Sequence, residues 1–298
     1  MNLLTRVASL LLLLMALFLA TRATIRALPG DPLEAVIAET GTTIPPEVLR
    51  SELGLDRPFL LSALNDLRSA FQGDFGTSLA SRNPIAPDLA RRFRNTLMLT
   101  TTALLLAAGF SLWLGLAAAA RPGGWADRFC TLHGAISAAV PTAWSGPIWI
   151  LLLAVWIPIF PIGGHIGLPA LALAVSVSGL WARLVRVRVV ESLNWGAAPG
   201  ARARGVPEWK VLVKYGLAPV SGALLGYLGT QFGGLLAGAF VTEIVFDWNG
   251  LGSGIVEAVL QRDYPMVEAG VFTAAAACLV ANSLGDWLQS RWEPCKDS

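Results

Sequence analysis

The sequence has few charged residues. Asp, Glu, Lys and Arg together make up 14% of its 298 residues, whereas 54% are hydrophobic. A soluble domain of this length carries a much larger share of charge, so a soluble fold is excluded. The apolar residues occur in long runs separated by shorter polar stretches. This pattern predicts an all-α protein that crosses a membrane several times.

The sequence also lacks the motifs of common catalytic and metal sites. Its two histidines, His133 and His165, are far apart and have no cysteine or carboxylate at ligand spacing, so no metal site is expected. Cys130, Cys278 and Cys295 form no paired spacing and are interpreted as inert thiols. Neither a GxxxxGK[ST] phosphate-binding loop nor a GxSxG nucleophile turn is present. No catalytic role is therefore expected.

Acidic residues are nearly absent from the apolar runs. Glu268 and Asp286 lie in the last run or at its ends, and Glu243 closes the run before it. Ion-coupled transporters usually need buried ionisable groups near the membrane midplane. These carboxylates are interpreted as anchors at helix ends, so the energy for uphill transport is expected to come from elsewhere.

Six apolar runs approach the length of a membrane span, because about 20 helical residues cross about 30 Å of hydrocarbon. The predicted spans are residues 3–25, 96–120, 132–159, 168–185, 217–241 and 266–288. The first has a short apolar centre, for which a signal peptide is the alternative. A retained helix is favoured because the other spans need an odd helix to place the most basic loop inside. Arg22 and Arg26 are then expected to extend outward from its far end.

The charges of the short loops predict the orientation. Lys and Arg are concentrated at residues 121–128 and 183–214 and in both tails, which are therefore expected in the cytoplasm. The polar segment at residues 27–95 has no spanning run and is expected outside. Helices are predicted there over residues 45–54 and 58–71.

A further helix start is predicted where Asn83 is followed by Pro84, a capping residue before a proline. Ile85, Leu89 and Phe93 then recur on one face. This pattern is interpreted as a helix along the membrane surface that leads into the next span.

Glycine is abundant in the fifth predicted span. Several of the glycines follow one another at four-residue steps, which allow close contact between helices. They are Gly222, Gly226, Gly229, Gly233, Gly234 and Gly238. Packing within the chain is one interpretation, and a partner interface or pore wall is the other.

The loop between the fourth and fifth spans, residues 186–216, contains a predicted helix break. Gly205 can take the left-handed conformation that ends a helix, and Pro207 suits the first turn of the next. The second helix is expected to place four residues on one face: Trp209, Leu212, Val213 and Gly216. Two helices around a glycine corner would form a rigid structure that another protein could hold. A solvated or membrane-facing basic patch is the alternative.

Six short motifs occur in a fixed order along the chain. They are PGDP at 29–32, LGLDRP at 53–58, GDFGTSL at 73–79, ARARG at 201–205, EIVFDWNGLG at 243–252 and RDYP at 262–265. Because these motifs occur in this order, the chain resembles the permease subunits of ATP-binding-cassette importers for dipeptides, oligopeptides and nickel. The resemblance covers nearly the whole length of the chain. The resemblance is to the subunit with a long external segment after its first helix. The chain departs from that pattern by being shorter at residues 160–167 and 215–219.

The resemblance implies that residues 186–216 are a cytoplasmic coupling loop that contacts an ATPase subunit. By position in the ARARG motif and directly after it, the contact residues would be Ala201, Arg202, Ala203, Arg204, Gly205, Val206, Pro207 and Glu208. It further implies a single permease domain, residues 1–298, in a bacterial inner membrane with both termini in the cytoplasm. The chain itself would bind no cofactor, and the partner subunits would use ATP and Mg.

The resemblance also implies the partners. They would be a second homologous permease subunit, two ATP-binding-cassette ATPase subunits and a periplasmic or tethered solute-binding protein. The solute would be a small peptide or a related compound, with metal chelates, opines and sugars as alternatives. Apart from membrane lipid no other partner is implied, and the absence of a concentrated basic domain argues against nucleic acid. An ion-coupled secondary transporter and a non-transporting membrane receptor or scaffold remain alternatives, and no residue of the translocation path is identified.

Overall fold

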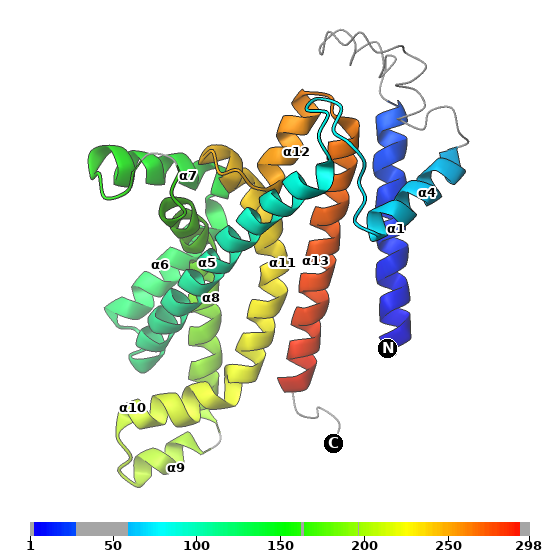
Figure 1. Ribbon diagram of the computed structural model, residues 1–298. Helices are drawn as coiled ribbons and strands as arrows, with labels where there is room; N and C mark the ends of the chain where they lie inside the picture. Colours follow the sequence, from blue (N-terminus) through cyan, green and yellow to red (C-terminus); the bar gives the residue numbers. More distant parts are fainter. Residues whose placement is uncertain (1–2, 28–58, 162–163, 196, 293–298) are drawn as a thin grey trace, which may run out of the picture. The chain divides into compact units, whose positions relative to one another are not determined.

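The computed structural model describes residues 3–27, 59–161, 164–195 and 197–292 (Figure 1). These residues contain no β-strand, although an isolated antiparallel bridge joins Thr77 and Pro84. The helices are α1 (Leu3–Ala27), α4 (Phe59–Phe71), α5 (Ile85–Ala120), α6 (Trp125–Ala139), α7 (Thr142–Ile150), η1 (Leu151–Trp156), α8 (Gly167–Asn194), α9 (Ala198–Ala203), α10 (Glu208–Lys210), η2 (Val211–Leu217), η3 (Ala218–Val220), α11 (Ser221–Val245), α12 (Leu251–Leu260) and α13 (Tyr264–Trp292). The all-helical class is confirmed. The motifs at 29–32 and 53–58 and the helix predicted over 45–54 lie outside the described residues.

Four of the described helices are long and apolar enough to cross a membrane. They are Ile85–Ala120, Gly167–Asn194, Glu208–Val245 and Tyr264–Trp287. They contain all or nearly all of the predicted second, fourth, fifth and sixth spans. Within α1 the apolar stretch is shorter, Leu11–Thr24. A bent pair of helices in the region of the third predicted span gives a fifth candidate if the pair crosses as one.

The span predicted over residues 132–159 falls in a region where the helix is bent. Here α6 and the segment Ala143–Trp156 meet at a bend of 114°. The break lies at Pro141, because proline has no amide hydrogen and disfavours helical geometry in the residue before it. Val140 is accordingly extended, with φ −97° and ψ 114°. This bend at Pro141 was not predicted from the sequence, and the crossing of the membrane by residues 132–159 stays a prediction.

Two compact units are distinguished within the chain. The first comprises Met1–Thr96 and Asn249–Leu279, and the second Leu97–Trp248 and Val280–Ser298. The boundary falls inside α5 and α13. The helix predicted to start after Asn83 and Pro84 is the first part of α5 and continues without a break into the second predicted span. Pro87 lies in the first turn of α5, where a missing amide hydrogen costs no helix bond, and no proline follows it in the helix.

A buried arginine joins the helices of the first unit. Arg22 of α1 is 6% exposed, forms an ion pair with Asp66 of α4 and donates to the Ser62 hydroxyl over 3.1 Å. Its Nη1 lies 3.8 Å from Oε2 of Glu268 in α13. The expectation that Arg22 extends outward was wrong, because α4 brings a carboxylate and a hydroxyl that satisfy the guanidinium inside the fold.

Close contact between α6 and α8 organises the second unit. A Cβ atom at Gly179 of α8 would lie 2.5 Å from the His133 carbonyl oxygen of α6, so only glycine fits there. His133 Nε2 lies 2.9 Å from the Ser178 hydroxyl. Asp127 accepts two hydrogen bonds from Arg186, at 2.5 and 2.9 Å. A small residue thus permits the approach, and polar side chains bond across the two helices.

Replacing Gly179 with alanine is expected to destabilise the protein by about 1–3 kcal/mol, because the added methyl group has no space against the α6 backbone. The measurement is thermal unfolding of the purified protein in detergent. Gly109→Ala in α5 is the matched control, since a Cβ atom at Gly109 meets nothing within 4 Å. Equal unfolding temperatures for the two variants would contradict the close contact between α6 and α8.

Candidate functional site

The residues after α8 form a helix that ends in a tight turn. Gly205 has a φ of +75°, the left-handed conformation. Its N–H donates to the Arg202 carbonyl over 2.9 Å, and the Val206 N–H donates to the Ala201 carbonyl over 3.1 Å. These two bonds define a Schellman turn, a common helix end in which glycine takes the left-handed position. The predicted glycine corner at Gly205 is therefore confirmed.

The turn is fixed to α8 by apolar contacts. Ala198 and Ala201 of α9 and Val211 of η2 are fully buried. They belong to one cluster with Val189 and Leu193 of α8. The same face of α8 therefore contacts both arms of the turn, which are α9 before it and the segment of α10 and η2 after it.

The second arm also approaches α8 through its backbone. A Cβ atom at Gly216 would lie 3.1 Å from side-chain atoms of Val189 and Leu193, which leaves little room for a larger residue. The Ser192 hydroxyl donates to the Tyr215 carbonyl over 2.8 Å. Figure 1 shows α9 and α10 together at one end of α8 and α11. The turn is therefore connected directly to two of the long apolar helices.

A bidentate ion pair between Arg202 and Glu208 spans the turn on its exposed side. Arg202 Nη2 lies 2.5 Å from Glu208 Oε1, and Arg202 Nε lies 3.2 Å from both carboxylate oxygens. The hydrogen bond to the Glu208 carboxylate raises the pKa of the Arg202 guanidinium above its usual value. Arg202 therefore stays charged at every physiological pH.

The structure places the eight predicted coupling residues on one continuous turn. Ala201 is buried, and Val206 is half-buried. The other six are exposed: Arg202, Ala203, Arg204, Gly205, Pro207 and Glu208. The helix after the turn begins at Glu208, so Pro207 lies one residue before it instead of within it. These residues form an accessible surface, and their contact with an ATPase remains a prediction.

The shared face predicted for the second helix is only partly observed. Gly216 is buried and Leu212 is half-buried, but Trp209 and Val213 are 65% and 48% exposed. The reason is that η2 is a π-helix, in which the spacing of 3.6 residues per turn no longer applies. Sequence reasoning also missed Val211, which is fully buried.

Two glycines of α11 contact the last helix. A Cβ atom at Gly229 would lie 2.7 Å from the Gly285 Cα atom, and one at Gly233 would overlap the Asn282 side chain. At Gly234 a Cβ atom would meet nothing within 4 Å. Packing within the chain therefore accounts for Gly229 and Gly233 but not for Gly234, and none of these contacts identifies the translocation path.

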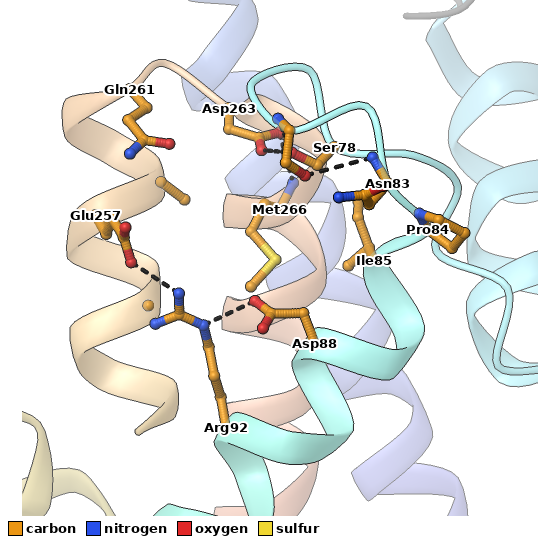
Figure 2. A pocket seen from close by; sticks show the side chains of 13 residues that line it. Ser78, Asn83, Pro84, Ile85, Asp88, Arg92, Glu257, Gln261, Asp263 and Met266 are labelled. Atoms are coloured by element: carbon orange, nitrogen blue, oxygen red, sulfur yellow. Dashed lines mark hydrogen bonds and ion pairs between the residues drawn. The ribbon is translucent and has the colours of Figure 1, made fainter. Parts of the chain in front are cut away.

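Two sequence motifs meet in the first unit (Figure 2). Asp263 of the RDYP motif accepts a hydrogen bond of 2.5 Å from the Ser78 hydroxyl and one of 3.1 Å from the Leu79 N–H. The Ser78 hydroxyl oxygen also accepts a bond of 2.9 Å from the Ser81 N–H. Asp263 is 3% exposed, so these bonds satisfy a buried carboxylate. The two motifs were noted in the sequence, but their contact was not predicted.

A pocket of about 290 Å³ lies beside this contact (Figure 2). Arg92 of α5 donates to Asp88 over 2.8 Å and to Glu257 of α12 over 2.7 Å. Gly254 lets the arginine lie against α12, since a Cβ atom there would be 2.6 Å from Arg92 Cδ. Sequence reasoning missed this site because Arg92 and Glu257 are 165 residues apart.

The residues considered for ion coupling and metal binding are not gathered into a site. Glu268 lies beside Arg22, and Asp286 is exposed. His133 bonds to Ser178, and His165 is exposed. Within the described ranges, no three His, Cys, Asp or Glu side chains lie close enough together to hold a metal ion.

Comparison with known proteins identifies the family. Residues 111–295 match the family described as binding-protein-dependent transport system inner membrane component. The chain belongs to this family. The glutathione transport system permease protein GsiC of Escherichia coli strain K12 is 34% identical over 275 residues, which cover 91% of this chain and 90% of the relative. The protein of the same name from Salmonella typhimurium strain LT2 is 33% identical with the same coverage.

Membership confirms the resemblance found from the ordered motifs. The protein is the permease subunit of an ATP-binding-cassette importer, and such subunits are not enzymes. The ATPase activity of these importers lies in partner subunits. The permease therefore functions with an ATPase and a solute-binding protein.

Substituting Asp263 by asparagine is expected to weaken the attachment of the segment around Ser78, because an amide has one acceptor oxygen and is uncharged. Loss of a hydrogen bond to a charged group costs about 1.5–3 kcal/mol. Limited proteolysis of the purified permease should then cut residues 73–84 sooner than in the wild type. Asp286→Asn, at an exposed carboxylate, is the control. Unchanged cleavage in Asp263→Asn would show that the contact does not hold this segment.

Proposed function

We propose that this permease forms half of the translocation path of an ATP-driven importer. A second, homologous permease subunit forms the other half, and two ATPase subunits bind on the cytoplasmic side. A periplasmic or tethered solute-binding protein delivers the solute from outside. Family membership supports this composition, since the family is defined by its dependence on binding proteins.

The proposed solute is a small peptide or a compound related to one. Support comes from relatives that align with 91% of the chain and are named glutathione transport system permease proteins. Glutathione is a tripeptide. Selection among such solutes rests with the binding protein. The permease supplies a path that accepts what is delivered.

The proposed topology has six spans in a bacterial inner membrane, with both termini in the cytoplasm. It places residues 27–95 outside and residues 186–216 inside, which agrees with the concentration of Lys and Arg in the short loops. Four long apolar helices and one bent pair support five of these spans. The sixth is α1.

The proposed coupling surface is the turn at residues 201–208. One observation carries this assignment: an exposed turn, closed by Gly205 in the left-handed conformation, is fixed to α8 by buried side chains. A rigid turn transmits a displacement that a flexible loop would absorb. The ATPase subunits bind ATP and Mg, and closure of these subunits shifts the equilibrium between the inward-open and outward-open states through this turn.

The composition is tested by purifying the tagged permease from its own membranes in mild detergent and identifying the accompanying proteins by mass spectrometry. The proposal predicts a second permease, an ATPase and, under conditions that preserve weaker contacts, a solute-binding protein. Recovery of the permease alone, from a preparation in which other membrane complexes survive, would contradict it.

Replacing Gly205 with valine is expected to abolish ATP-dependent uptake while leaving membrane insertion intact. A β-branched residue at φ +75° is strained by at least about 1–2 kcal/mol, so the turn opens or shifts. Uptake of labelled glutathione and ATP hydrolysis are measured in vesicles that contain the whole complex. Gly200→Ala in α9 is the control, because a Cβ atom there makes only an ordinary contact at 3.6 Å. Wild-type ATP hydrolysis and uptake in a well-expressed Gly205→Val variant would exclude the turn from coupling.

A further inference from the structure

The ion pair across the Gly205 turn joins the two helices that the turn separates. Arg202 lies in the last turn of α9, and Glu208 is the first residue of α10. Two guanidinium nitrogens lie within 3.2 Å of the carboxylate, so the pair fixes an orientation as well as a distance. Each charge also suits its helix end, since cations are favourable near a C-terminus and anions near an N-terminus.

We propose that Arg202 and Glu208 act together as a brace that holds the coupling turn in the geometry that the ATPase recognises. They are positioning residues: their role is to bond to each other, not to the partner. This inference rests on the proposed function, because it concerns the turn assigned there to coupling. It goes further by assigning a specific internal role to two of the exposed residues of that turn.

The described backbone hydrogen bonds of the turn do not join its two arms on the exposed side. The Schellman bonds hold Gly205 and Val206 to α9, but the described hydrogen bonds of Pro207 and Glu208 lead only forward into α10 and η2, apart from the bond to Arg202. On the exposed side, this side-chain pair therefore links the two arms directly. On the opposite side, the arms are held by α8 through Ala201 and Val211.

The brace is weak in the free permease and stronger in the complex. The side chains of Arg202 and Glu208 are 42% and 56% exposed, and an ion pair in contact with water contributes little to stability. When a partner covers the turn, water is excluded and the attraction between the two charges increases. Removing one charge then leaves the other buried without a partner, which costs more than the exposed pair contributes. The effect of breaking the pair should therefore appear in assembly and coupling, and not in the unfolding of the permease alone.

Reversing the two charges distinguishes a brace, in which Arg202 and Glu208 bond to each other, from a direct contact of either residue with the ATPase. The variants are Arg202→Glu, Glu208→Arg and the double swap that carries both changes. The complex is assembled with the tagged permease, and the ATPase subunits retained after washing are quantified together with ATP hydrolysis in liposomes. Each single reversal is expected to lower both by about tenfold, because it places two like charges together in the covered turn. The double swap is expected to recover to within about threefold of the wild type, since the reversed charges are less favourable at their helix ends.

A mismatched swap at the neighbouring arginine is the control. Arg204 is exposed and forms no ion pair with any described residue. The double variant Arg204→Glu/Glu208→Arg changes the same charges as the matched swap but does not rebuild the pair, so it should stay as defective as Glu208→Arg.

Arg202→Lys is expected to fall between Arg202→Glu and the wild type in ATPase retention and ATP hydrolysis, because lysine keeps the charge but not the bidentate geometry. Thermal unfolding of each permease alone should remain close to that of the wild type.

The outcomes distinguish failure of the brace from failure of the coupling assignment. A double swap as defective as either single reversal would overturn the brace, because it would place one of these side chains in direct contact with the ATPase. Unaffected single reversals together with a defective Gly205→Val variant would also overturn the brace, but the coupling turn would stand. If Gly205→Val and both reversals assembled and hydrolysed ATP as the wild type does, the proposed function of the turn would fail as well.

Discussion

The arrangement of the proposed coupling surface depends on one backbone constraint, the left-handed conformation of Gly205. It allows the Val206 N–H to bond to the Ala201 carbonyl, so that the chain reverses within a few residues after α9. A residue with a side chain is disfavoured at this φ, and the chain would then have to leave the helix by a wider path. The exposed positions of Arg202 and Glu208, and hence their ion pair, follow from this reversal.

The coupling role proposed for the turn requires that the turn be connected to the long apolar helices. Here Val189 and Leu193 of α8 bury residues from both arms, and the second arm continues through η2 and η3 into α11. A displacement at the turn therefore reaches α8 and α11 directly. No catalytic or metal-binding group is needed in the permease for this role, because ATP is used in the partner subunits.

The parts of the fold that were predicted correctly depend on local signals. Gly205 could be placed because few residues other than glycine tolerate that conformation, and the helix that begins after Pro58 ends at Phe71 as expected. The differences arose where the regular helical period fails. Pro141 bends the third predicted span, and the π-helix η2 changes the register between Trp209 and Gly216, so that Trp209 and Val213 are exposed. A spacing rule based on 3.6 residues per turn cannot predict either.

Contacts between distant segments could not be predicted from one sequence. The bond from Ser78 to Asp263 joins residues 185 apart, and neither motif alone indicates its partner. Arg22 was expected to extend outward because it lies near the far end of the first predicted span, whereas its partner Asp66 lies on another helix. The ion pair between Arg202 and Glu208 is the opposite case. Its two residues are only six apart, but their approach depends on the turn between them.

Site-specific photocrosslinking can detect contact between the Gly205 turn and the ATPase. A photoreactive residue is introduced in place of Ala203, which is small and exposed on the turn, and the intact complex is irradiated in its native membranes. We expect an adduct between the permease and the ATPase subunit from this position, and none with the ATPase from Leu105, an exposed position in the apolar part of α5. Adducts from Ala203 with lipid alone, in a complex that retains its ATPase, would contradict the assignment of this turn to coupling.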